Sequence, residues 1–260
     1  MTRKITSAVM PLVVFGALIA FGYLPGIPLL AQAGKALGPY GYSFIANTVW
    51  IVVPILALTV ARRSFRAALE ELGILANPLR PLFFGFVATL PAAIGFALTA
   101  HVDPSVTPRA FFLLCLYSPF AEEVLFRAFA FGQLYERARW NFLAAALVPA
   151  VLFAAGHASQ SRDPAELAGI LAITVLGAFV FSYFFIRFRR NIWAPFALHA
   201  LLNTWWTIFT VNQTALGGLS DNIFRFGSIG LAFGLAYSAS YLGAFRIFAP
   251  KNGAWRSVAA

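Results

Sequence analysis

Long apolar runs constrain the fold of this chain more than any other feature. A helix needs about 20 mainly apolar residues to cross the hydrocarbon core of a bilayer. Segments of roughly that length recur along the 260 residues, at 8–30, 41–61, 81–100, 110–134, 141–158, 165–186, 192–211 and 224–247. Hydrophobic residues make up 60% of the chain and charged residues only 11%, which is outside the usual balance of soluble proteins. The sequence therefore predicts an all-α fold, a polytopic bundle of about eight transmembrane helices that forms one integral membrane domain over 1–260.

Two segments need a specific interpretation. The first apolar run follows Thr2-Arg3-Lys4 and resembles the start of a signal peptide, but no cleavage site follows it, so we expect a retained helix. Between the second and third runs, residues 62–80 place apolar side chains at helical spacing among arginines and glutamates. This pattern predicts a short helix lying in the membrane interface, with a plain solvated connection as the alternative.

The basic residues of the loops predict the orientation of the bundle. With a cytoplasmic N-terminus, fourteen Lys and Arg residues fall on the inner side: Arg3, Lys4, Arg62, Arg63, Arg66, Arg80, Arg137, Arg139, Arg187, Arg189, Arg190, Arg246, Lys251 and Arg256. Four fall on the outer side: Lys35, Arg109, Arg162 and Arg225. Cytoplasmic loops carry an excess of Lys and Arg, so we expect a multi-pass protein of the cell membrane with both termini in the cytoplasm.

Two classes of partner or cofactor do not fit this composition. The net charge of +10 is divided among short clusters between apolar runs, so we expect the lipid bilayer and no nucleic acid as a partner. Cys115 is the one cysteine and lies inside an apolar run, which excludes an internal disulfide framework and a cysteine-rich metal site. The sequence gives no indication of the oligomeric state.

Polar residues inside the apolar runs are few and occur in pairs. A charge near the bilayer centre costs about 2.5 kcal/mol or more, so such residues require a function. Residues four apart share one face of a helix, and this spacing relates Glu123 to Arg127, Phe153 to His157 and His199 to Asn203. Glu122 points about 100° away from Glu123 and lacks such a partner. Because lipid cannot solvate these groups, we expect them to face one another or a water-filled cavity.

Three short motifs carry a resemblance to a known family. "EEVLFR" (122–127), "FAAGH" (153–157) and "HALLN" (199–203) are similar to the EExxxR, FxxxH and HxxxN motifs of the CAAX protease and bacteriocin-processing family, and they occur in the family's order. The resemblance covers the motif-bearing core at about 110–205. It implies an intramembrane endopeptidase of the glutamic type that acts on a membrane-associated protein or peptide and uses no cofactor or metal.

The same resemblance implies a role for each motif residue. Glu122 resembles the general base that activates water, and His157 resembles the histidine that helps to hold this water. His199 and Asn203 resemble the pair that stabilises the oxyanion. Glu123 and Arg127 resemble the supporting part of the first motif.

The residue types by themselves are compatible with these roles but leave alternatives open. A carboxylate without a local partner suits a general base, and His199 and Asn203 can donate hydrogen bonds to an oxyanion. Glu122, His157 and His199 could instead bind zinc in a membrane protease. A transporter or proton relay also uses intramembrane Glu and His. A non-catalytic bacteriocin-immunity or binding protein on the same scaffold is a further alternative.

The expected depths of the site residues raise one difficulty. At 1.5 Å of rise per residue, straight and upright helices would place His157 roughly 10 Å further toward the outer face than Glu122. Helix tilt, a bend at Pro119, or an extension of the helix beyond residue 158 could close this gap. The shallow end would then face outward, which predicts a polar entrance on the outer side, with a lateral opening between helices as the alternative.

Overall fold

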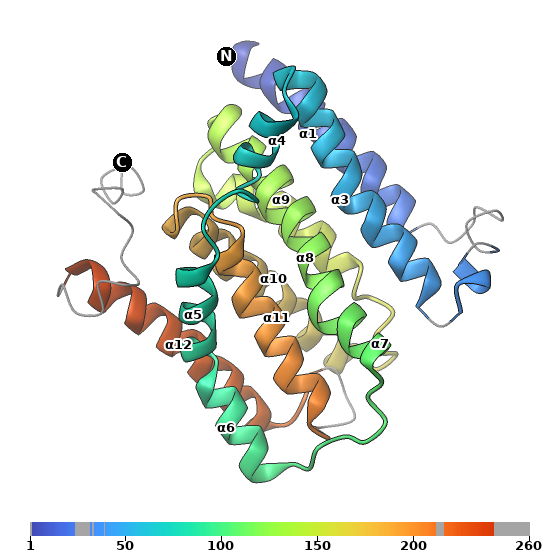
Figure 1. Cartoon of the computed structure of the whole chain (residues 1–260), viewed down its shortest axis with the longest axis vertical. Coiled ribbons are helices and arrows are strands. Elements are labelled where there is room, and N and C mark those ends of the chain that lie inside the picture. Colours follow the sequence, from blue (N-terminus) through green and yellow to red (C-terminus); the bar gives the residue numbers. More distant parts are fainter. Residues whose placement is uncertain (1, 24–31, 33, 39, 212–215, 242–260) are drawn as a thin grey trace.

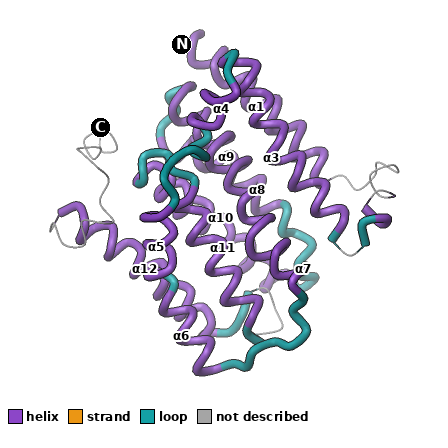
Figure 2. The backbone as a smooth tube through the Cα atoms, viewed as in Figure 1, coloured by secondary structure: helices purple, strands orange, loops and turns teal. Residues whose placement is uncertain are grey.

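The regular structure of the described residues is helical. A computed structural model describes residues 2–23, 32, 34–38, 40–211 and 216–241, and in these the helices are joined by turns and loops, with one isolated β-bridge between Val102 and Phe209 (Figures 1 and 2). The predicted all-α class is therefore confirmed for the described part of the chain.

A helix or a series of helices forms most of the described part of each apolar run, although α9 and α11 end three residues before the runs 141–158 and 192–211 do. The bounds are α1 Thr2–Tyr23, α3 Gly41–Arg62, α5 Leu79–Ala88, α6 Leu90–Thr99, α9 Phe142–Ala155, α10 Pro164–Arg187, α11 Trp193–Ile208 and α12 Leu219–Tyr241. The ends predicted at 24–30 and 242–247 lie outside the described residues.

The fourth run is one long helical path with widened turns. It comprises α7 Pro108–Phe111, the π-helix η1 Phe112–Tyr117, α8 Ser118–Glu122, and the π-helices η2 Glu123–Phe131 and η3 Gln133–Arg137. Short π-helical insertions in α-helices are frequent at functional sites. Here η1 precedes the first motif, and η2 contains all of the motif except Glu122.

Length and apolar composition qualify part of this set as membrane spans. Within the described residues, α3 and α10 meet these criteria, and α5 with α6 gives a third if the bent pair counts as one span. The two helices of this pair meet at an angle of 42°. Pro91 lies at the start of α6, where its ring and its missing N–H disrupt the turn before it. Shorter apolar helices occur at 8–21 within α1 and in α9.

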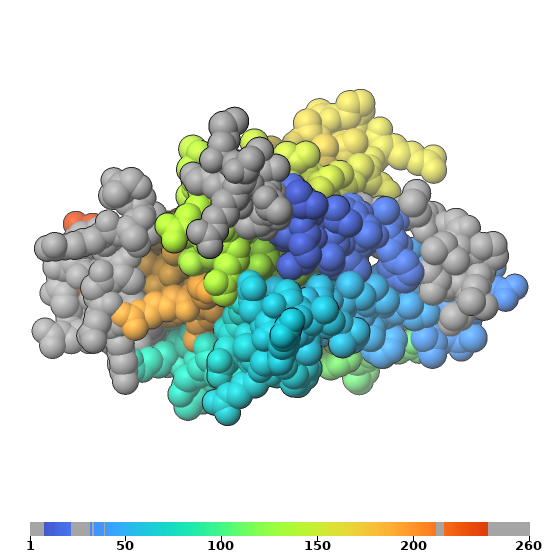
Figure 3. Space-filling view, turned by 90° about the horizontal axis from the view of Figure 1, so that it is seen from above, coloured from blue at the N-terminus to red at the C-terminus, as the bar shows by residue number. Residues whose placement is uncertain are grey.

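The buried carboxylate of Glu71 connects several helices at the end of the bundle that carries the basic loops. The helix predicted between 62 and 80 is present as α4, Phe65–Glu71, and Ser64 caps its start by accepting a hydrogen bond from the Ala67 N–H. Glu71 accepts hydrogen bonds from Arg62, Gln133 and Arg137. Figure 3 looks down on this end, where the cyan segment containing α4 lies among blue, green and orange segments.

Burial and charge act in opposite directions on Glu71. Burial raises the pKa of its carboxyl, but the hydrogen bonds from Arg62, Arg137 and Gln133 outweigh burial and hold the pKa well below its ordinary value. The carboxylate therefore stays ionised and joins α3, α4 and η3. Arg190, from the connection between α10 and α11, donates to the Glu71 carbonyl and brings a third basic connection to the same place.

The loops after α6 and α11 meet at the opposite end of the molecule (Figure 1). Asp103 N–H donates to the Ile208 carbonyl at 2.9 Å, and Thr210 N–H donates to the His101 carbonyl at 2.7 Å. Along the bundle, α11 lies close against α5, because a Cβ on Gly85 would stand only 2.5 Å from Ala197 Cβ. A small residue at this position permits the close approach that fixes α11, two residues before His199.

Candidate active site

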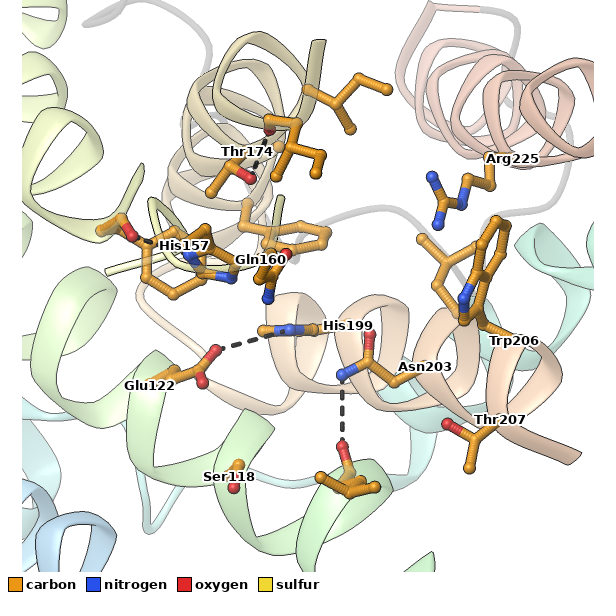
Figure 4. A pocket seen from close by; sticks show the side chains of 17 residues that line it. Ser118, Glu122, His157, Gln160, Thr174, His199, Asn203, Trp206, Thr207 and Arg225 are labelled. Carbon is orange, nitrogen blue, oxygen red and sulfur yellow. Dashed lines mark hydrogen bonds and ion pairs between the residues drawn. The ribbon is translucent and has the colours of Figure 1, made fainter. Parts of the chain in front are cut away.

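The fourth helical run and α9 to α12 surround a cavity of about 530 Å³ (Figure 4). Its lining residues are Leu114, Ser118, Glu122, Phe153, His157, Gln160, Ile170, Ile173, Thr174, Gly177, Phe181, His199, Leu202, Asn203, Trp206, Thr207 and Arg225. Four of the six residues singled out in the sequence, Glu122, His157, His199 and Asn203, therefore come together around one space. Glu123 and Arg127 do not line the cavity and lie behind its wall.

The two adjacent glutamates of the first motif have different environments. Glu122 is the last residue of α8, and its side chain is 20% exposed at the cavity. Glu123 begins η2, and its side chain is fully buried. Neighbouring residues on a helix point in directions about 100° apart, so one carboxylate can reach a water-filled space while the other stays in the protein interior.

His199 joins these two carboxylates. Its Nδ1 lies 2.8 Å from Glu123 Oε1, and its Nε2 lies 3.6 Å from Glu122 Oε2. An ionised carboxylate can only accept, so Nδ1 carries the proton of the shorter contact. Phe181 stacks against the imidazole at a centroid distance of 5.1 Å and an interplanar angle of 23°. The ring is thus held with Nε2 toward Glu122 and the cavity.

Glu123 is balanced by a buried arginine. Arg127 Nε lies 3.4 Å from Glu123 Oε2, and the two side chains are 1% and 0% exposed. The guanidinium carbon lies 4.6 Å from the ring centre of Phe153, 5.3 Å from Phe181 and 5.9 Å from Phe126. Aromatic faces attract a cation, so these three rings supplement an ion pair that is too long for a strong hydrogen bond.

His157 reaches the cavity from a turn beyond the end of α9. Its Nδ1 lies 2.8 Å from the carbonyl oxygen of Phe153, which can only accept, so Nδ1 is the donor. Nε2 of the neutral ring is then an acceptor. Of the three ways to close the depth gap, an extension of this helix beyond residue 158 is excluded, since α9 ends at Ala155. His157 nevertheless lines the same cavity as Glu122, so the depth difference expected for straight, upright helices does not keep them apart.

Asn203 is oriented by a backbone carbonyl that Pro119 leaves available. In η1 the Ser118 N–H bonds to the Leu113 carbonyl, five residues back. The same pattern would pair the Leu114 carbonyl with residue 119, but proline has no N–H. Asn203 Nδ2 donates to this carbonyl at 3.2 Å instead. An amide nitrogen carries two N–H groups, so this bond fixes the amide and leaves a second donor.

The cavity also contains residues that the motifs did not indicate. Ser118, Gln160, Thr174, Trp206, Thr207 and Arg225 contribute its other polar groups. Arg225, which is expected on the outer side, lies in α12, and this helix begins at Leu219, five residues before the predicted run 224–247. Asp221 accepts a hydrogen bond from the Gly218 N–H, and this start signal in the sequence could have placed the helix correctly.

In the described ranges, no three residues among His, Cys, Asp and Glu are placed to hold one metal ion. Glu122, His157 and His199 share the cavity without forming such a set.

The chain is helical with two or three candidate membrane spans among its described residues, and comparisons with known proteins show which family it resembles. Residues 104–205 match the family model described as "Type II CAAX prenyl endopeptidase Rce1-like". A curated Bacillus subtilis (strain 168) protein named "Putative membrane peptidase YdiL" is 29% identical over 212 residues, which cover 73% of this chain and 81% of the relative. No solved structure matches. The part of the chain over residues 104–205 is therefore similar to the Rce1-like type II CAAX prenyl endopeptidases.

The buried pair predicts a strong energetic coupling. Arg127→Met should lower the stability of the purified protein by about 3 kcal/mol or more, because it leaves a buried carboxylate without its counter-ion. Adding Glu123→Gln should restore much of that loss, since the uncompensated charge is then absent. Thermal unfolding of both single variants and the double variant in detergent gives the coupling.

The exposed pair Arg66 and Glu70 is the matched control. It has the same i, i+4 spacing, with side chains 82% and 53% exposed. Arg66→Met and Glu70→Gln should couple by less than about 0.5 kcal/mol. If the coupling energy between Glu123 and Arg127 is as small as that of this control pair, the proposed charge balance is contradicted.

Proposed function

We propose that this protein is a glutamic-type intramembrane endopeptidase that hydrolyses a peptide bond in a membrane-associated protein or peptide. The observation that carries the proposal is the position of Glu122. Its carboxylate reaches the cavity and lies 3.6 Å from the Nε2 of a histidine whose other ring nitrogen is fixed by a second carboxylate. A base and an adjacent oriented donor are what water-dependent acyl transfer requires.

The first step of this reaction is the activation of water. Glu122 takes a proton from a water molecule in the cavity, and the oxygen attacks the carbonyl carbon of the scissile peptide bond. His157 assists because its Nδ1–H is engaged with the Phe153 carbonyl, so that Nε2 can accept a hydrogen bond from the same water. Glu122 and His157 thus hold the nucleophile from two sides.

The second step is the stabilisation of the tetrahedral intermediate. Asn203 donates its second N–H to the oxyanion, while its first remains on the Leu114 carbonyl. His199 provides another donor when its Nε2 carries a proton, and Glu123 fixes the orientation of this ring through Nδ1. Glu122 then gives its proton to the leaving amine, the C–N bond breaks, and the carboxylate returns to its initial state. Glu123 and Arg127 act through His199 as positioning residues.

Metal-dependent hydrolysis has less support from the geometry. A catalytic zinc needs three protein ligands that converge on one point, and the described residues offer no such set. We therefore assign the activation of water to Glu122 rather than to a bound ion.

We further propose that residues 1–260 form one membrane domain of about eight spans, with the motif-bearing core at 110–205 and both termini in the cytoplasm. The gathering of the basic loops around Glu71 at one end of the bundle supports this orientation. Several lining residues of the cavity lie toward the helix ends that are opposite to Glu71. These are Leu114, Gln160, Thr207 and Arg225. These positions support an entrance on the outer side of the membrane.

The role of Glu122 predicts a selective loss of cleavage. Glu122→Gln should lower kcat by at least about a hundredfold, because an amide cannot serve as the base. The assay uses purified protein in liposomes with a library of apolar peptides, and mass spectrometry identifies the new termini. Thr174→Val is the matched control, since Thr174 lines the same cavity and its hydroxyl only donates back to the Ile170 carbonyl. Full cleavage by a folded Glu122→Gln variant would refute the assignment.

The proposed orientation predicts which loops can be reached from outside the cell. In a Cys115→Ser background, Ser105→Cys in the loop after α6 should react with an impermeant thiol reagent on intact cells. Arg66→Cys, at an exposed position of α4, should react only after the membrane is permeabilised. The reverse labelling pattern would overturn the orientation and the outward entrance together.

A further inference from the structure

A guanidinium lies in the wall of the cavity away from the motif residues. Arg225 belongs to α12, outside the residues that match the family model. Its guanidinium carbon lies 3.4 Å from the centre of the Trp206 ring, and its Nη1 donates to the Leu216 carbonyl at 3.3 Å. Figure 4 shows Glu122 and Arg225 on different sides of the cavity, with His199 and Asn203 between them.

Stacking on an indole gives this guanidinium a fixed plane. An arginine laid on an aromatic face keeps its N–H groups directed outward from the edge of the plane, where they match the two oxygens of a carboxylate. Asp221, one turn earlier in α12, accepts a hydrogen bond from the Gly218 N–H and attracts Arg225 electrostatically, but it does not line the cavity. The cavity is therefore polarised, with a carboxylate on one side and a cation on another.

This polarity discriminates between peptides that could enter. Glu122 would repel an anionic group placed beside it, whereas Arg225 would attract one in a space that is partly shielded from water. Carboxylates are the anions that an unmodified peptide carries. A peptide bound with its scissile bond near Glu122 and its carboxylate at Arg225 keeps its negative charge beside the cation and away from Glu122.

We propose that Arg225 is a specificity-determining residue that binds a carboxylate of the substrate on the far side of the cavity from Glu122. This inference rests on the proposed function, because the bound peptide is a substrate only if the protein is a peptidase. The binding itself does not require catalysis. The carboxylate could be the free C-terminus of the peptide or an Asp or Glu side chain close to the scissile bond. The chemistry at Arg225 is the same in both cases.

The test measures binding instead of cleavage. Glu122→Gln protein in lipid nanodiscs is incubated with three sets of N-acetylated apolar pentapeptides, and bound peptides are quantified by mass spectrometry. One set ends in a free carboxylate, one in a carboxamide, and one in a carboxamide with an internal Asp or Glu. We expect at least one anionic set to be retained about tenfold or more over the neutral carboxamide set. The better retained anionic set identifies the source of the carboxylate.

Variants at Arg225 connect this preference to the side chain. Arg225→Gln in the same background should bring the preference close to unity, and Arg225→Lys should keep part of it because the charge remains without the planar fork. Arg162→Gln is the control, since Arg162 is an exposed arginine that does not line the cavity. It should retain the full preference.

Two results would overturn the proposal independently of whether the protein is a protease. One is equal retention of all three sets by protein with Arg225 intact, which needs no Arg225 variant to fold. The other is an unchanged preference in folded Arg225→Gln. Failure of the proposed function would appear instead as absent cleavage by the wild-type chain, with the carboxylate preference intact.

Discussion

The buried contact between Glu123 and its two partners is the interaction on which the site depends. A carboxylate with no exposed surface is costly in a protein interior and far more so within a bilayer. Here Arg127 supplies the counter-charge and His199 supplies the hydrogen bond. Removing either partner leaves an ion that neither lipid nor the surrounding aromatic residues can solvate. The three residues must therefore be held together, and this requirement fixes α11 against η2.

This contact explains how two adjacent glutamates can serve different purposes. With Glu123 committed to Arg127 and His199, Glu122 is left at the cavity with Nε2 of His199 at 3.6 Å. The packing of Phe153 and Phe181 on Arg127 connects α9 and α10 to the same cluster. A substitution at Arg127 would thus disturb three helices, although this residue does not line the cavity.

The sequence predicted the residue pairs better than the shapes of the helices. Spacings of four placed Glu123 beside Arg127 and His199 beside Asn203, because this relation follows from helix geometry alone. The π-helical turns around Glu122 could not be foreseen, since they depend on packing and not on a local pattern. Pro119 did indicate a disturbance there, but only the structure shows that it frees the Leu114 carbonyl for Asn203. The catalytic roles remain predictions.

The central claim is that Glu122 activates a water molecule and does not itself attack the peptide bond. A single turnover in H₂¹⁸O, with enzyme in excess over a cleaved peptide, separates the two mechanisms. If Glu122 is the base, the new carboxylate of the product carries one ¹⁸O and Glu122 carries none. If the first-turnover product lacks ¹⁸O and the label is found in the Glu122 carboxyl, a covalent acyl-enzyme has formed and the account is contradicted.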